Sequence, residues 1–242
     1  MTARPLLGRR VPLDSEPLSL GRRAAYRRVL AIMGAQPNPF VVSGALGLSL
    51  QLGRLIDGDL EICMHAEDMP AALEGFTAAG LRTDRDEGHR KARIVYGNHR
   101  VLLRWALPRP LVGIYDEAWF ERSRRMRFLG IRVRVAPAEE ILWLRMVLPS
   151  GASLADPLVA QLLLARGPEL DWLRLMGRMI GQEALFLAHI FLFWHQYPES
   201  ARHVVPDWLV SRLRDRMDRL EDREPTGDCP VESVDLSSHG GS

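Results

Sequence analysis

The sequence is short of two residue types that define several classes of protein. Among 242 residues there are two cysteines, Cys63 and Cys229, which are too few and too separate for a disulfide framework or a zinc site. Lysine occurs only as Lys91, and we attribute this arginine bias to a GC-rich genome, without functional weight. The low cysteine content favours a reducing, cytoplasmic location.

Long apolar runs and a large net charge are also missing. The most apolar stretch, residues 184–194, is interrupted by His189 and is shorter than the roughly 20 residues that span a bilayer. We therefore expect a buried helix there and no membrane association. The N-terminus carries arginines but no apolar segment of signal-peptide length behind them. With 32 basic and 30 acidic residues the formal charge is +2, so net charge gives no argument for a nucleic-acid partner.

The order of apolar patterns indicates the fold class. The chain is long enough to bury a core, as one large domain or two small ones. Strand and helix patterns share its first part, whereas only helical patterns follow residue 155. We expect an α+β protein with a small mixed β-sheet and helices in residues 18–150 and an all-helical domain in residues 151–223. Residues 1–17 are expected to be a flexible arm and residues 224–242 a disordered tail, the latter for lack of large apolar residues.

Periodicity, proline and glycine predict the individual elements. Residues 82–91 are highly charged and are expected to form a loop, and Gly97 with Asn98 favours a hairpin turn. Helices are expected at residues 19–33, 45–52, 66–79, 136–148, 156–165, 171–179, 183–194 and 206–223, and strands at residues 40–42, 59–64, 92–96, 100–107 and 130–135.

Residues 40–64 contain the candidate site. Alternation along a strand would place Asp59 and Glu61 on one face, roughly 6.5 to 7 Å apart. Such a pair can bracket Mg²⁺ or Mn²⁺, which favour oxygen ligands and keep positions for substrate phosphates. Ser43 and Gly44 form the turn before the next helix, where glycine permits close approach and free N–H groups favour phosphate. The segment therefore predicts a site for a divalent cation and a nucleotide.

At these residues the chain resembles the nucleotidyltransferase superfamily, with its polymerase-beta-like fold, and within it the bacterial branch that includes abortive-infection toxin-like proteins. The family shows a strand, a Gly-Gly or Gly-Ser turn, a short helix, an arginine and an acidic-hydrophobic-acidic triplet. Here these features are Ser43-Gly44, Arg54 and Asp59-Leu60-Glu61. The resemblance implies a nucleotidyltransferase domain in which Asp59 and Glu61 are catalytic metal ligands and Ser43, Gly44 and Arg54 bind the nucleotide.

The sequence departs from the family pattern at several positions. Ser43 replaces the first glycine, and Glu61 stands where aspartate is usual. In the strand around residues 99–105, Leu102 replaces the third carboxylate and Arg104 replaces a histidine. A missing third carboxylate should weaken or abolish transfer; Asp116 or Glu117 could substitute for it. In the helix at residues 136–148, Arg145 takes the place of the family's lysine, and an arginine there could pair with a triphosphate.

Two functions follow from the resemblance. In the first, Mg²⁺ or Mn²⁺ binds an NTP, and a hydroxyl of an unknown acceptor (a protein, an RNA end or a small molecule) receives the nucleoside monophosphate. In the second, the chain is a catalytically degenerate relative that binds or regulates, a reading that Leu102 favours. Retention of Asp59 and Glu61 favours the first.

Each residue also has a purely structural interpretation. Asp59 and Glu61 could be an exposed strand edge, Ser43-Gly44 a simple turn, and Arg54 a solvated side chain. Histidines show no metal-ligand spacing. Aromatic residues at the ends of the late helices are expected to be core anchors, or else a platform for a base: Trp194, Tyr197 and Trp208.

Overall fold

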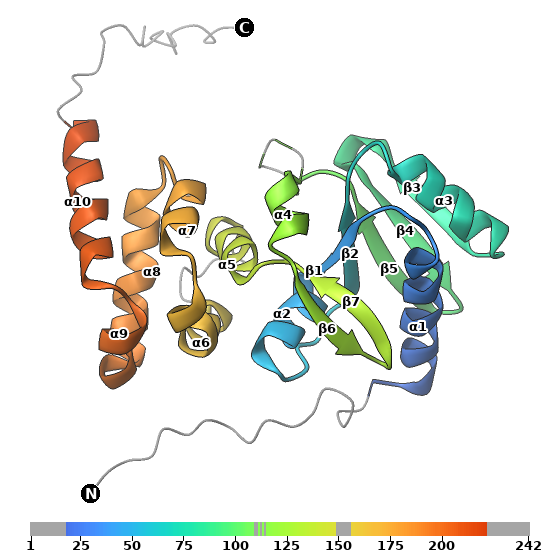
Figure 1. Cartoon of the computed structure of the whole chain (residues 1–242), viewed down its shortest axis with the longest axis horizontal. Coiled ribbons are helices and arrows are strands. Elements are labelled where there is room, and N and C mark those ends of the chain that lie inside the picture. Colours follow the sequence, from blue (N-terminus) through green and yellow to red (C-terminus); the bar gives the residue numbers. More distant parts are fainter. Residues whose placement is uncertain (1–17, 109–110, 112, 114, 149–155, 222–242) are drawn as a thin grey trace, which may run out of the picture.

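The computed structural model describes residues 18–108, 111, 113, 115–148 and 156–221. Its centre is a mixed seven-stranded sheet with the strand order β3-β4-β5-β2-β1-β7-β6 (Figure 1). β1 pairs antiparallel with β2 and parallel with β7, and β2 pairs parallel with β5. The strands are β1 Phe40–Ser43, β2 Leu60–Met64, β3 Arg82–Asp86, β4 Lys91–Tyr96, β5 His99–Arg104, β6 Arg124–Phe128 and β7 Ile131–Val135.

The helices divide between the sheet and a second, all-helical half of the chain. Figure 1 shows α5 between the sheet and the later helices, with α1 and α3 on the other side of the molecule. None of the helices in the described part combines the length and apolar character of a bilayer span. The helices are α1 Leu20–Gly34, α2 Gly44–Leu52, α3 Met69–Ala78, α4 Glu117–Glu121, α5 Ala138–Val147, α6 Pro157–Arg166, α7 Trp172–Arg178, α8 Glu183–Gln196, α9 Pro198–Val204 and α10 Asp207–Glu221, with short 3₁₀ turns at Glu87–His89 and Gly167–Glu169.

Strand alternation gives the sheet two apolar faces. On β2, Leu60, Ile62 and Met64 pack in the cluster that holds the buried sides of α1 and α3. Cys63 belongs to the other cluster, which continues through α5 into the helical half. Because period-two alternation separates these sets, Glu61 and Cys63 face the helical half.

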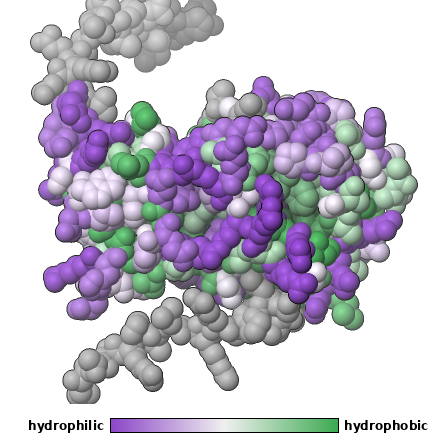
Figure 2. Space-filling view, viewed as in Figure 1, coloured by the Kyte–Doolittle hydropathy of each residue, from purple (hydrophilic) through white to green (hydrophobic). Residues whose placement is uncertain are grey.

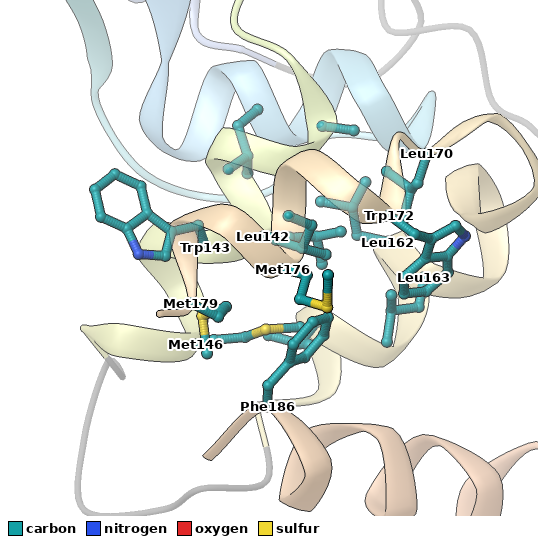
Figure 3. Packing of buried hydrophobic residues seen from close by; sticks show 14 of the residues in the cluster. Leu142, Trp143, Met146, Leu162, Leu163, Leu170, Trp172, Met176, Met179 and Phe186 are labelled. Atoms are coloured by element: carbon teal, nitrogen blue, oxygen red, sulfur yellow. The ribbon is translucent and has the colours of Figure 1, made fainter. Parts of the chain in front are cut away.

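The helical half is joined to the sheet domain through α5. Figure 3 shows the side chains of α5 to α8 meeting in one cluster, with Leu142 and Met146 near Met176, Met179 and Phe186. Burial of this apolar surface is the main stabilising contribution. At the same junction the wholly buried Glu140 forms ion pairs with Arg174 and Arg178 of α7.

The structure confirms the α+β class, with a mixed sheet first and helices afterwards. The predicted loop at residues 82–91 is wrong, because β3 and a 3₁₀ turn occupy it. β6, α4 and α9 were not predicted, and the helix expected from residue 66 begins at Met69. Asp59 lies one residue ahead of β2 and not within it. The expected arm, the tail and the boundary at residue 150 fall outside the described residues.

Candidate functional site

The corner between β1 and α2 is built around one glycine. Ser43 ends β1 and is almost wholly buried, and Gly44 follows with φ of +60° at the start of α2. Ser43 pairs in register with Glu61 of the neighbouring strand. A Cβ at residue 44 would lie 3.0 Å from the Glu61 Cβ, so both the backbone angle and the close approach of Glu61 favour glycine. The predicted contact between the glycine corner and Glu61 is therefore present.

A second glycine holds the segment before β2 against the same helix. Gly58 has φ of +149°, and a Cβ there would overlap the Cβ of Ala45 in the first turn of α2. Ser49 of α2 fixes the intervening chain, because its hydroxyl accepts a hydrogen bond from the Ile56 N–H at 2.8 Å. The residues leading to Asp59 are thus packed against α2 by side-chain and backbone contacts.

Glu61 is paired with Arg104. β2 and β5 run parallel, with Glu61 beside Leu102 and Cys63 beside Arg104. Arg104 Nε donates to Glu61 Oε2 at 3.0 Å, and the two side chains are only 16% and 17% exposed. Burial opposes the guanidinium charge, but attraction by Glu61 outweighs it and raises the pKa of Arg104. The carboxylate predicted to bind a cation is already neutralised by a fixed positive group.

Cys63 and Tyr115 extend this polar group into the interior. The Cys63 thiol lies 3.9 Å from Glu61 Oε1. Burial, and then the charge of Glu61, raise the pKa of Cys63. Burial likewise raises the pKa of Tyr115, with a smaller contribution from Cys63. Both groups are therefore neutral, and Cys63 is not an activated nucleophile.

Asp59 directly precedes β2 and lies near Arg22 of α1. Its side chain is 67% exposed, and Oδ1 is 3.8 Å from Arg22 Nη2. Arg22 also bonds the Gly58 carbonyl and lies 3.1 Å from Asp57 Oδ1. Asp59 lines a pocket of about 490 Å³ together with Arg22, His99 and Arg100. Asp59 and Glu61 thus have different arginine neighbours, Arg22 on α1 and Arg104 on β5. Their joint role as metal ligands stays a prediction.

The two arginines predicted to bind a nucleotide have structural partners. Arg54 donates to Gln161 of α6. Arg145 Nε donates to Asp156 Oδ2 at 2.7 Å, and Asp156 in turn caps α6 through the Leu158 N–H. Neither contact involves the glycine corner. Their nucleotide-binding roles stay predictions.

The residues considered as a replacement third carboxylate are also engaged elsewhere. Asp116 pairs with Arg178 of α7. Glu117 lies 3.6 Å from His65 Nε2, and His65 stacks against Phe120 with ring centroids 4.0 Å apart. Neither has a contact with Glu61 within the described residues.

These contacts decide how well the residues fit the cation that the resemblance implies. Within the described ranges no group of three or more His, Cys, Asp or Glu side chains is placed to hold a metal ion. Leu102, which cannot bind a cation, lies beside Glu61, where the family pattern has a third carboxylate. The Glu61 carboxylate is itself engaged in an ion pair with Arg104. The site as built does not fit a two-cation centre, and the magnesium prediction stays a prediction.

Two neighbours of the candidate site residues could not be identified from the sequence. They are Arg22, which lies near Asp59, and Arg104, which pairs with Glu61. Alternation along residues 99–104 places Arg104 and Leu102 on one face, but only the parallel pairing of β2 with β5 brings them to Glu61. Arg22 follows the Ser19 cap by one turn, which gave no signal that it reaches Asp57 and Asp59.

Comparison with known proteins gives the following. No protein-family model matches the chain, and no curated protein matches it. An antigenic nucleotidyltransferase-like protein from Paracoccidioides brasiliensis aligns with 78% of this chain and 95% of its own, at 11% identity and a TM-score of 0.49. The antibiotic-resistance factor ANT(2'')-Ia aligns over 83% and 95%, at 14% identity and a TM-score of 0.42. The lincosamide antibiotic adenylyltransferase LnuA, bound to lincomycin, aligns over 61% and 98%, at 10% identity and a TM-score of 0.42. These identities and TM-scores are too low to carry an argument about function, which therefore rests on the residues of the site and the distances between them.

Proposed function

We propose that the chain is a nucleotide-binding protein of the nucleotidyltransferase type whose transfer chemistry is degenerate. The observation that carries this proposal is the ion pair between Arg104 and Glu61, at 3.0 Å and largely shielded from solvent. It lies beside Leu102, where the family pattern has a third carboxylate. A buried carboxylate that already has a guanidinium partner gives up that contact only at a cost in free energy.

Arginine at this position can also donate further hydrogen bonds, because its bond to Glu61 uses Nε. Gly44 brings the start of α2 next to Glu61, and the N–H groups of a helix start favour anions. Arg104 can offer a guanidinium to a phosphate without any cation, because planar N–H groups match phosphate oxygens. Nucleotide binding at this corner would therefore be independent of divalent metal.

Transfer of a nucleoside monophosphate is the second candidate. It is favoured by Asp59, which is 67% exposed beside a pocket of about 490 Å³, and by the orientation of Glu61 toward Gly44. The acceptor would be a hydroxyl of a protein, an RNA end or a small molecule.

Calorimetric titration with each of the four NTPs tests the proposal, with Mg²⁺ in one series and EDTA in the other. We expect one NTP to bind in both series with dissociation constants that agree within about threefold. Arg104→Gln keeps a donor for Glu61 but removes the charge, and we expect it to weaken binding about tenfold. Arg212→Gln removes the same charge from an exposed position on α10 and serves as the matched control.

Pyrophosphate release in the presence of Mg²⁺ or Mn²⁺ separates the two candidates. The proposal predicts no release by the parent chain. Release that disappears in Asp59→Ala would establish the transferase instead. Absence of NTP binding in both series would overturn nucleotide binding itself.

A further inference from the structure

The β6–β7 hairpin at one edge of the sheet has an unusually uniform charge. It carries Arg124, Arg125, Arg127, Arg132 and Arg134 and no acidic residue between residues 124 and 135. Arg125 faces Arg134 across the antiparallel pair, and Arg127 faces Arg132. Like charges directly opposite one another are destabilising, so this ribbon stores repulsion that an anion would relieve.

The repulsion is not relieved inside the protein. Arg124 lies 3.4 Å from Glu169, and Arg134 donates to the Phe120 carbonyl at 3.3 Å. Within the part of the chain that the structure describes, Arg125, Arg127 and Arg132 have no acidic partner and are exposed. Hydrophilic residues extend across the middle of the face shown in Figure 2.

Strand alternation puts the cross-strand arginines on one face of the hairpin. Val133 and Val135 of β7 pack in the cluster with α1, so Arg132 and Arg134 project to the opposite face, as do their partners on β6. Ser43 and Glu61 belong to the same face, because Val42 and Ile62 belong to the α1 cluster. Neighbouring arginines on one strand are spaced at roughly 6.5 to 7 Å along it.

The hairpin borders a pocket that is both basic and apolar. It has a volume of about 430 Å³, lies in the size range of ligand sites, and includes Arg125, Arg132 and Arg134. Its other wall is the connection between α1 and β1, with Pro37, Asn38 and Phe40. None of the residues that line it is acidic. Phe40 is half-buried and packs against the α1 cluster, so it contributes to an apolar wall opposite the arginines.

From this arrangement we propose that the hairpin and its pocket bind single-stranded nucleic acid. The arginines would contact successive phosphates, and the wall of Phe40 and Pro37 would take a base. A strand of stacked bases on a charged backbone is the ligand that this combination recognises without sequence preference. The net charge of +2 conceals the site because acidic residues elsewhere balance the hairpin. The inference does not depend on nucleotide binding at the glycine corner.

Single strands fit better than a duplex or a membrane. A two-stranded ribbon can itself enter the major groove of a duplex, but the pocket beside this ribbon would take an unpaired base, which a duplex does not offer. Membrane-surface binding uses an amphipathic helix with a basic face, and the charge here lies on two strands.

Fluorescence anisotropy with fluorescein-labelled 12-nucleotide poly(U) and poly(dT) tests the proposal, between 50 and 200 mM NaCl. We expect both oligonucleotides to bind, with a slope of log K against log salt of about −2 to −3 for three to four phosphate contacts. The double variant Arg125→Ala/Arg132→Ala should weaken binding about tenfold or more and flatten the slope by about 1 to 2. Tighter binding of poly(U) would identify RNA as the preferred source of the strand.

Two further variants make the test specific. Arg212→Ala/Arg214→Ala removes the same charge from exposed positions of α10, which Figure 1 shows on the far side of the helical half from the hairpin, and should leave binding within about twofold. Phe40→Leu reduces the apolar wall of the pocket, and should weaken binding about fivefold without changing the salt slope. Circular-dichroism melts of all variants confirm that they are folded.

Three outcomes would overturn the proposal. The first is that neither oligonucleotide changes the anisotropy at 50 mM NaCl. The second is that the hairpin and α10 variants lose equal oligonucleotide affinity. The third is that the protein binds vesicles of anionic phospholipid but not the oligonucleotides.

Discussion

Arg104 on β5 donates to Glu61 on β2 across two neighbouring parallel strands, with 3.0 Å between Nε and Oε2. The contact lies beside the corner at Gly44. Glu61, which the sequence predicts to be a cation ligand, is therefore engaged in an ion pair. Both side chains are more than four-fifths shielded from solvent, so removing either one should have a measurable effect on the free energy of unfolding.

A double-mutant cycle measures this pair. We expect Arg104→Leu to lower the free energy of unfolding by about 3 kcal/mol, because it leaves a carboxylate buried without a partner. The double variant Arg104→Leu/Glu61→Leu should lose less than the sum of the single changes, with a coupling of about 1 to 3 kcal/mol. Urea denaturation at pH 7 provides all four values.

The pair Arg93–Asp84 is the control for this cycle. Its atoms are 3.4 Å apart, but its side chains are 43% and 62% exposed, so we expect a coupling below about 1 kcal/mol. A coupling at Arg104–Glu61 no larger than at the control would contradict the role given to the pair.

Gly44 and Gly53 separate backbone strain from crowding. Both have positive φ, +60° and +70°, but only Gly44 has Glu61 next to the position of a Cβ. Gly53→Ala should cost about 1 kcal/mol for the left-handed conformation, and Gly44→Ala about 2 to 3 kcal/mol. Equal losses in urea denaturation would show that Glu61 moves aside freely.

Asp171 predicts a dependence of stability on pH. Its carboxylate accepts from the Arg174 N–H at 3.0 Å and lies 2.6 Å from Arg122 Nη1. The backbone hydrogen bond, more than the ion pair, lowers the pKa of Asp171. A lowered pKa means that the stabilisation is present above the unfolded-state value of about 3.9 and is lost as pH falls through the folded-state value.

Asp171→Asn keeps a cap oxygen but removes this titration. Because the side chain is 41% exposed, we expect the variant to reduce the loss of stability between pH 5 and 2 by less than about 1 kcal/mol. Urea denaturation across that range is the measurement, with Asp215→Asn on the exposed face of α10 as the control. A larger pH effect for the control would argue against the cap.

The buried position of Cys63 predicts that its thiol reacts slowly with external reagents. The residue is wholly buried, and burial raises the pKa of its thiol. In a Cys229→Ser variant, which leaves Cys63 as the single thiol, we expect the native protein to react with Ellman's reagent only as fast as it opens. The rate should rise steeply near the urea midpoint. Immediate reaction of the native protein would place Cys63 at an accessible surface.

The sequence predicted best the elements whose apolar periodicity is strong and local. β1, α2, α6, α7, α8 and α10 have that property, and their positions agree within a few residues, whereas the short α9 was not predicted. β3 and β6 were missed for a common reason. They are the two edge strands of the sheet, rich in charged residues such as Arg85 and Arg125, and edge strands carry charge that hides a strand pattern.

The candidate site was predicted in part. Local alternation correctly placed Glu61 toward Gly44. It could not reveal that Arg104 is its partner, because parallel pairing joins positions 43 residues apart in the chain. Nor could it show that Arg22 of α1 lies 3.8 Å from Asp59.

The contacts of Tyr26 have a mechanical consequence. Its hydroxyl accepts from the Leu60 N–H at 3.0 Å and from Arg22 Nε at 2.9 Å, which fastens α1 to the first residue of β2. Arg22 bonds the Gly58 carbonyl as well, so a displacement of α1 would pull on Gly58 and Leu60, the two residues on either side of Asp59.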